Sequence, residues 1–319
     1  MKSATVSLCI PTHGRPQLLQ EALESGIDQT QLPSEIVVSD DAGSEEVREL
    51  VEAFARNSAM PVRYVRCATP GQPDNINNCF REAASDLILL LHDDDLLTPI
   101  AVEELRKPFL ENEAVVASFG KQIVVTNEGK ELLEDSDDLN EQYCRTVGRA
   151  GLQPEALVSA ILQQFPNDGY MVRTSVARAV LQRARYGTAC DFDFGIRCAE
   201  AGAFYFINQF TAKYRLSVES VVRGSQSRGR DDGAYQSMHL CLELLERYPR
   251  LASQIRQKLR QYAPGGIMQA IRSGRLDEAK QWYFGPFHRG RICTPGGIRR
   301  GLLYLHARSK AGGAGTQSR

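Results

Sequence analysis

The chain has 319 residues, of which 42% are hydrophobic, and its 38 Lys and Arg against 39 Asp and Glu give a formal net charge of −1. This length suits one large domain or one domain with an appendage, and the balanced charge excludes the basic field typical of nucleic-acid-binding proteins. No apolar run approaches the roughly 20 residues of a membrane span, and we expect no signal peptide. Eight Cys without a Cys-x-x-Cys pair indicate reduced thiols, which predicts a cytoplasmic protein.

Strands and helices are predicted to alternate through the first hundred residues. Short apolar runs predict strands at 6–10, 35–39, 62–65 and 87–91. Apolar residues at helical spacing predict helices at 17–25, 45–57, 74–84 and 98–110. This order predicts an α/β fold, with a mostly parallel sheet wound with helices through right-handed crossovers.

After residue 110 the alternation breaks. We expect a strand pair at 114–119 and 122–126, a mobile acidic loop at 134–142, and two further strands at 204–207 and 212–216. Helices are predicted at 152–164, 174–185, 190–202, 235–248, 251–262, 266–273 and 276–284. The chain therefore divides into a domain over residues 1–225 and a helical extension over residues 226–319.

Three carboxylates, Asp93, Asp94 and Asp95, follow the apolar strand at 87–91. Neighbouring like charges repel by roughly 1 to 4 kcal/mol, so a cation is expected beside them. An ordinary acidic turn and helix cap is the alternative. Ligands of open α/β sheets bind outside the carboxyl ends of strands, and the strand at 35–39 also ends in acidic residues, Asp40 and Asp41. The pattern favours a hard divalent ion shared with substrate phosphates.

Five segments together make the chain similar to glycosyltransferase family 2, the inverting family with the A-type nucleotide-diphospho-sugar-binding fold. These segments are 6–15, 35–44, 75–83, 91–99 and 190–197. They follow the family's order and spacing. The resemblance implies an A-type glycosyltransferase fold, Rossmann-like and mostly parallel, with the helical C-terminal extension outside it.

The resemblance also implies a site for a nucleoside-diphosphate sugar. Its residues would be Pro11, Thr12, His13, Arg15, Asp40, Asp41, Asn75, Asn77, Asp93 and Asp94. Alternatives stay open for several of them: a turn residue for His13, a helix cap for Asp40 or Asp41, and polar helix caps for Asn75 and Asn77.

The family's metal-ligating Asp falls at Asp94, with Asp95 beside it, and the ion would be Mn2+ or Mg2+. His92 stands where most relatives carry the first Asp of the Asp-x-Asp motif, so the ligand set among the three Asp remains open. Inversion needs a base that accepts the proton of the acceptor hydroxyl. Asp191 matches the family's base, although Cys190 replaces the usual Glu before it. Asp193 is the reserve, and an ordinary helix cap is the alternative for Asp191.

Two basic segments follow the core. Arg215 and the loop at 223–230 would close over the diphosphate, with a solvated polar loop as the alternative. The segment at 298–310 is both apolar and basic. It would rest on an anionic membrane surface, at the inner face of the cell membrane, or be a helix docked on the protein with a solvated basic side. A homodimer stays open.

The sequence thus predicts an inverting, metal-dependent glycosyltransferase. It would move a sugar from a UDP-sugar, or from a dTDP- or GDP-sugar, to a glycan or lipid-linked acceptor in bacterial surface polysaccharide synthesis, with no nucleic-acid partner. A nucleotidyltransferase is the first rival, although it would usually show a Gly-rich basic signature after the first strand. A non-catalytic sugar-nucleotide-binding protein is the second.

Overall fold

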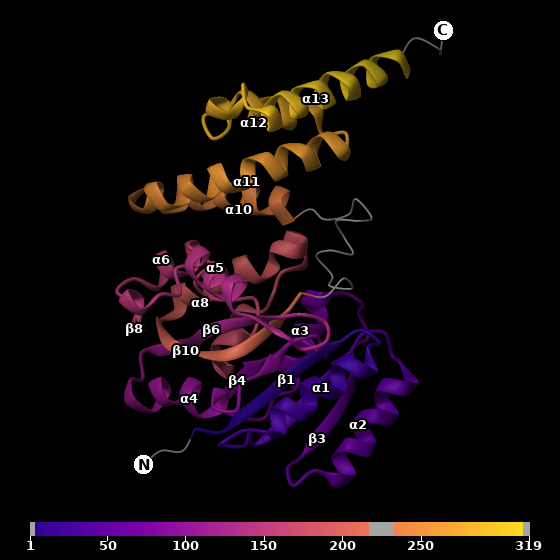
Figure 1. The fold of residues 1–319 in the computed structure, drawn as a ribbon, viewed down its shortest axis with the longest axis vertical. Helices are drawn as coiled ribbons and strands as arrows, with labels where there is room; N and C mark the ends of the chain where they lie inside the picture. The colour runs from indigo at the N-terminus through magenta and orange to yellow at the C-terminus, as the bar shows by residue number, and fades with distance from the viewer. Residues whose placement is uncertain (1–3, 217–232, 315–319) are drawn as a thin grey trace. The chain divides into compact units, whose positions relative to one another are not determined.

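The computed structural model describes residues 4–216 and 233–314, which Figure 1 draws as ribbon. The described residues form two compact units, one of residues 4–184 and 190–216 and the other of residues 185–189 and 233–314. The basic loop expected at 223–230 lies outside the described residues.

The first unit contains the sheet and the helices packed on it. Its strands are β1 (Val6–Thr12), β2 (Glu35–Asp40), β3 (Val62–Arg66), β4 (Leu87–Leu90), β5 (Leu96–Leu97), β6 (Val115–Val125), β7 (Glu131–Leu132), β8 (Gly151–Leu152), β9 (Tyr170–Arg173) and β10 (Ala203–Arg215). Its α-helices are α1 (Pro16–Ile27), α2 (Glu45–Asn57), α3 (Gln72–Glu82), α4 (Ala101–Glu111), α5 (Leu133–Gln142), α6 (Ala156–Ile161), α7 (Thr174–Val180) and α8 (Cys190–Ala201).

The strand order is β3-β2-β1-β4-β9-β6-β10-β5, with β7 paired to β6 and β8 paired to β10. Neighbours among β3, β2, β1 and β4 run parallel, and so do β6 and β10, whereas β9 runs antiparallel to both β4 and β6. The predicted mostly parallel sheet wound with helices is therefore confirmed, and β9 is the strand that reverses direction inside it.

Both faces of the sheet centre are buried. Along β1, Leu8 and Ile10 belong to the apolar cluster that includes Leu19 of α1, while the Cys9 thiol lies 3.7 Å from the carbonyl oxygen of Cys79 in α3. Neighbouring side chains of a strand point to opposite faces, so β1 packs on helices from both sides. This burial explains why the predicted strands read as continuous apolar runs.

Four predicted strands are instead two long strands. β6 runs without a break through Gly120, and β10 spans both predicted strands at 204–207 and 212–216. A Cβ at Gly120 would lie 2.4 Å from Oγ1 of Thr211 and 2.7 Å from the carbonyl oxygen of Gln209. Gly120 therefore marks the close approach of β10, not a turn.

The acidic segment expected to be a mobile loop is helix α5, and this expectation was wrong. Its buried side chains are polar and bond to β6. Ser136 Oγ accepts from the backbone N–H of Val124 at 2.8 Å, and the Asn140 side chain exchanges hydrogen bonds with the backbone of Gln122 at 2.8 and 3.1 Å. Helix α5 is thus held on β6 by hydrogen bonds and does not need apolar residues at helical spacing.

Some predicted helices have different bounds. The helix predicted at 174–185 ends at Val180, since Leu181 has a φ of +43°, and the segment at 152–164 contains β8 before α6. The helices predicted at 251–262 and 266–273 are one, α11.

The second unit contains α10 (Gly233–Arg247), α11 (Ala252–Arg272), α12 (Leu276–Phe284) and α13 (Pro295–Ala314). Among the described helices of the chain, none combines the length and apolar character needed to cross a membrane. All eight cysteines are free thiols: Cys293, before α13, is exposed, Cys144 is partly buried and the other six are buried.

Candidate active site

Three strand ends meet at one edge of the sheet. Thr12, which ends β1, is the register partner of Asp40, which ends β2. The hydroxyl of Thr12 donates to Oδ2 of Asp93, just beyond β4, at 2.6 Å. The acidic residues that follow β2 and β4 therefore lie at the same carboxyl edge, where ligands bind in open α/β sheets.

Arg15 holds two of the three consecutive carboxylates. Its guanidinium donates to both oxygens of Asp93, with Nε 3.0 Å from Oδ2, and to Oδ2 of Asp94 at 3.0 Å. Burial alone would lower the pKa of Arg15, but Asp93 and Asp94 outweigh it and raise that pKa. For Asp93 burial dominates, so its pKa stays above the ordinary value despite Arg15 and Thr12. Arg15 thus offsets the repulsion between the two carboxylates.

A second buried carboxyl group stands behind this turn. Asp168 is fully buried, accepts from the backbone N–H of His92 at 3.1 Å, and shares a hydrogen bond with Asp95. Burial and the charge of Asp168 raise the pKa of Asp95 well above the ordinary value. A Cβ on Gly169, which has a φ of +67°, would lie 2.6 Å from that of Ala212, so the backbone next to Asp168 requires glycine.

His92, Asp94 and Asp95 form the group best suited to a metal ion among the described residues. One ligand atom from each lies within 4.8 Å of the others. Nε2 of His92 is buried and has no hydrogen-bond partner among the described residues, which is costly unless a ligand binds there. Two carboxylates and an imidazole suit a divalent transition metal. The residues present therefore fit an ion, and they add His92 to the expected Asp94 and Asp95.

Asp191 lies in the first turn of α8, where its Oδ1 accepts from the backbone N–H of Phe192 at 2.8 Å. Burial raises its pKa, and the charges of His92 and Asp168 act on it as well. It lines a small hollow together with Gln163, Phe165 and Gly195. Asp191 is thus within electrostatic reach of the group around His92, and a raised pKa is what a general base needs.

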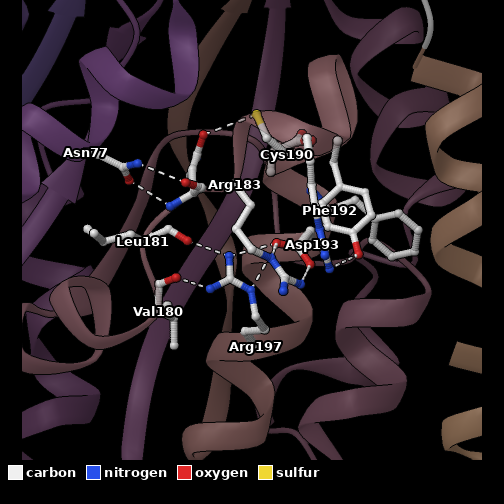
Figure 2. A network of polar contacts seen from close by, with 12 residues as sticks. Asn77, Val180, Leu181, Arg183, Cys190, Phe192, Asp193 and Arg197 are labelled. Atoms are coloured by element: carbon white, nitrogen blue, oxygen red, sulfur yellow. Dashed lines mark hydrogen bonds and ion pairs between the residues drawn. The ribbon is translucent and has the colours of Figure 1, made fainter. Parts of the chain in front are cut away.

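Asp193 has a structural role instead of the reserve role as base. Figure 2 shows its carboxylate between Arg183 and Arg197, with hydrogen bonds of 2.9 Å from Nε of Arg183 and 2.7 Å from a terminal nitrogen of Arg197. Arg197 also donates to the carbonyl oxygens of Val180 and Leu181. With a side chain only 1% exposed, Asp193 ties this loop to the helix that carries Asp191.

Asp40 and Asp41, which stand at the end of β2 and were expected to bind the nucleotide's base or ribose, differ in their contacts. Asp40 is fully buried and accepts from the backbone N–H groups of Ala42 at 3.0 Å and Ser44 at 2.7 Å, so it shapes the turn before α2. Asp41 lies 2.7 Å from Nδ1 of His13, whose side chain is 70% exposed. The Asp41 side chain is only 5% exposed, so His13 is the accessible member of this pair.

The two asparagines of α3 bond inside the protein. Asn75 accepts from the hydroxyl of Ser39 at 2.6 Å and donates to the carbonyl oxygen of Thr12 at 2.8 Å. Asn77 bonds to both the N–H and the carbonyl oxygen of Gln182, at 2.7 and 2.8 Å (Figure 2). Pro11 is buried within β1. All three position the edge of the sheet and the loop before α8.

Arg215, expected to close over the diphosphate together with the basic loop at 223–230, is buried beside the acidic turn. Its backbone N–H donates to Oδ1 of Asp95 at 2.7 Å, its Nε donates to the carbonyl oxygen of Asp94 at 2.9 Å, and its guanidinium pairs with Glu21. No local sequence pattern indicates these contacts, because the partners lie far apart along the chain. Arg215 joins the end of β10 to the acidic turn.

Comparisons with known proteins agree with this geometry. Residues 7–155 match the family model Glycosyl transferase family 2. The uncharacterized glycosyltransferase YwdF of Bacillus subtilis is 32% identical over 120 residues, which cover 36% of this chain and 43% of that protein. The GalNAc(5)-diNAcBac-PP-undecaprenol beta-1,3-glucosyltransferase of Campylobacter jejuni is 28% identical over 121 residues, covering 37% and 38%. The chain thus matches less than half the length of these curated relatives.

Solved structures extend the likeness of the fold along nearly the whole chain. S. aureus TarS 1-349 in complex with UDP superposes with a TM-score of 0.55 at 15% identity, covering 97% of this chain and 92% of that one. The mannosyltransferase PcManGT from Pyrobaculum calidifontis, in complex with GDP-Man and Mn2+, has a TM-score of 0.57 at 16% identity, covering 97% and 86%. With the strand order, these likenesses show that the chain has the A-type glycosyltransferase fold, and residues 7–155 of it match the model of glycosyl transferase family 2.

Proposed function

We propose that this chain is an inverting glycosyltransferase that uses a nucleoside-diphosphate sugar and a divalent cation, Mn2+ or Mg2+. The observation that carries the proposal is the group at the carboxyl edge, where His92, Asp94 and Asp95 offer three ligand atoms within 4.8 Å. Burial raises the pKa of Asp191, which lies within electrostatic reach of His92. A metal site and a base candidate within electrostatic reach of each other are the two parts that such a transfer needs.

Each part of the proposed site has its own task. His13, Asp41 and Arg15 line the nucleotide side, where His13 is the most exposed of the three. An ion held by His92, Asp94 and Asp95 would offset the charge of the departing diphosphate. Asp191 accepts the proton of the acceptor hydroxyl as that oxygen forms its bond to the anomeric carbon. Thr12, Asp93 and Arg215 keep the acidic turn in place.

We further propose a UDP-sugar as the donor, with dTDP- and GDP-sugars as the next choices, and a glycan or lipid-linked glycan as the acceptor. The structure of TarS with UDP and the named undecaprenol-linked substrate of the Campylobacter relative support this choice. A membrane-borne acceptor would require peripheral contact of the chain with a membrane. Residues 1–225 would be the catalytic domain, and residues 226–319 its helical extension.

The donor is tested by thermal unfolding and calorimetry with UDP-, GDP- and dTDP-sugars, each with and without Mn2+. We expect one nucleotide class to stabilise the protein, and to do so more strongly with the ion, since a ligand that binds only the folded state raises the unfolding temperature. The Asp94→Asn variant, expected to lose the contribution of Mn2+, is the control. Stabilisation by no donor, with or without the ion, would contradict the assignment.

Reaction products separate the proposal from its rivals. A glycosyltransferase releases the nucleoside diphosphate, whereas a nucleotidyltransferase running in reverse consumes pyrophosphate and forms a sugar phosphate. The anomeric configuration of the product, read by NMR, tests inversion. Donor binding that persists in Asp191→Asn, with no turnover by the unchanged protein on any acceptor, would support the non-catalytic alternative.

A further inference from the structure

Helix α13 attaches to the second unit by one face only. The hydroxyl of Tyr283 in α12 donates to the carbonyl oxygen of Gly297 at 3.0 Å, and Nε of Arg300 donates to Nε2 of the buried His288 at 3.1 Å. Tyr304, one turn after Arg300, is 8% exposed. Gly297, Arg300 and Tyr304 follow helical spacing and define the inner face.

The opposite face of α13 carries three large apolar side chains. Ile298 is 52% exposed, Leu302 is 63% exposed and Leu305 is 60% exposed. Single exposed apolar residues are ordinary, but these three recur at helical spacing and so form one continuous stripe. We call Ile298, Leu302 and Leu305 the apolar stripe. No other described residue of the second unit covers it.

Basic residues border this stripe. At about 3.6 residues per turn, Arg299 and Lys310 fall on one side of it and Arg308 on the other, and all three are exposed. The chain has no Asp or Glu after Glu278, so this part of the sequence carries positive charge without compensation. An apolar stripe with Arg and Lys on its borders suits a helix that lies in the plane of an anionic membrane surface.

We propose that α13 docks on an anionic lipid surface, with the apolar stripe in the headgroup region and Arg299, Arg308 and Lys310 on lipid phosphates. The charge favours lipid over a second copy of this chain, because two copies of so basic a helix would repel each other. The proposal extends the proposed function and rests on it only for the lipid-linked acceptor. Docking would hold the enzyme where such an acceptor lies.

The test is flotation of the full-length protein with vesicles of phosphatidylcholine alone or mixed with equal parts of phosphatidylglycerol. We expect binding to the mixed vesicles only, weakened by salt because the charges are screened. No donor or acceptor is present, so this result stands apart from that of the donor assays. Absence of binding, or equal binding to both kinds of vesicle, would overturn the proposal.

Two variants locate the surface. Leu302→Ser with Leu305→Ser removes most of the apolar stripe, and Arg299→Gln with Arg308→Gln removes two charges; each pair should lower vesicle binding about tenfold or more. The matched control is Arg256→Gln with Arg260→Gln, the same loss of charge at exposed positions of α11. All variants should keep the circular dichroism and unfolding temperature of the parent.

The same variants distinguish the other occupants. If the Leu302→Ser, Leu305→Ser protein changed from dimer to monomer on gel filtration and still bound the vesicles, the stripe would be a contact between copies and the proposal would be wrong. If the control pair lost binding as strongly as the α13 pair, general positive charge would explain the binding. Loss confined to the α13 variants supports the assigned surface.

Discussion

The carboxylates at the two edges of the sheet have opposite surroundings. At the amino end, Glu35 accepts from the hydroxyl of Ser7 and the N–H of Ala84, both at 2.6 Å, and from Arg63 at 3.1 Å. At the carboxyl end, Asp95 adjoins the buried Asp168, and Nε2 of His92 has no partner among the described residues.

The difference separates a carboxylate that stabilises the fold, Glu35, from one proposed to bind a ligand, Asp95. Hydrogen bonds of the protein itself hold Glu35, so its charge strengthens the fold. The carboxyl end gathers like charges and an unpaired imidazole, which cost stability until a ligand arrives, and functional sites are where such exceptions are expected. Changes at the carboxyl end should therefore remove chemistry and spare the fold, while changes at the amino end should do the reverse.

The largest effect is expected from Asp191→Asn. Loss of a general base lowers kcat by about 10²- to 10⁴-fold. The unfolding temperature should stay the same or rise, because burial raises the pKa of Asp191 and its charge is therefore held at a cost. Initial rates and thermal unfolding measure the two quantities. Asp137→Asn, at an exposed position of α5, is the control.

The pH profile sharpens this test. Asp191 must be deprotonated to act as a base, so the rate should fall as the pH drops through its pKa, which lies above the ordinary value of 3.8. The residual activity of Asp191→Asn should lack this decline. If Asp191→Asn kept the parent's rate and the same decline of the rate at low pH, another group would be the base.

Asp193→Ala should mainly lower the stability of the fold, whereas Asp191→Asn should mainly lower kcat. It leaves Arg183 and the largely buried Arg197 without their carboxylate, which costs about 3 to 5 kcal/mol of unfolding free energy. Urea unfolding measures this loss. The isosteric but uncharged replacement, Asp193→Asn, should lose less because its amide oxygen still accepts hydrogen bonds. If Asp193→Ala unfolded like the parent, the network of Figure 2 would contribute no stability.

His92→Ala should weaken Mn2+ binding by at least the roughly 10- to 100-fold that is typical of changes just outside a ligand set. Calorimetry on the protein without donor measures this effect, so no turnover is needed. His92→Asp should restore binding and shift preference from Mn2+ toward Mg2+, since oxygen ligands suit Mg2+ and imidazole suits transition metals. Equal Mn2+ affinity in the parent and His92→Ala would remove His92 from the site.

The smallest effect is expected at the amino end, from Glu35→Gln. Burial alone would raise the pKa of Glu35, but hydrogen bonds from Ser7, Ala84 and Arg63 outweigh it and lower that pKa. Its contribution to stability, about 1.5 to 3 kcal/mol, should be complete above the ordinary pKa of 4.5 and disappear as the pH falls through the lowered value. The variant should therefore match the parent in acid, differ at neutral pH, and retain kcat.

The sequence predicted the wound sheet well where local pattern and tertiary packing agree. Strands β1, β2 and β4 are buried on both faces, so their apolar runs were visible in the sequence. Helix α5 was not predicted, because Ser136 and Asn140 join it to β6 through hydrogen bonds. The helix therefore lacks the regular spacing of apolar residues that indicates a helix in a sequence. The continuity of β6 was not predicted, because Gly120 is required where β10 approaches β6 closely, and this contact exists only in the tertiary structure.

The sequence predicted which acidic residues belong to the candidate site, but it did not predict the hydrogen-bond partners of the site residues. Asp93 to Asp95 stand at a strand end, which sequence alone indicates. The contacts of Asn75, Asn77 and Arg215 join segments that are far apart in the chain, so no local pattern reveals that these side chains are already engaged. The unpartnered nitrogen of His92 is likewise a property of the folded surroundings.

The distribution of cysteines has a practical consequence. Because Cys293 is exposed and six of the other seven thiols are buried, a maleimide dye should react there first, without engineered substitutions. Cys293 comes two residues before Pro295, where α13 begins, so a polarity-sensitive fluorophore on it would report the arrival of this helix at a lipid phase in real time. The chain carries its own attachment point for a spectroscopic reporter.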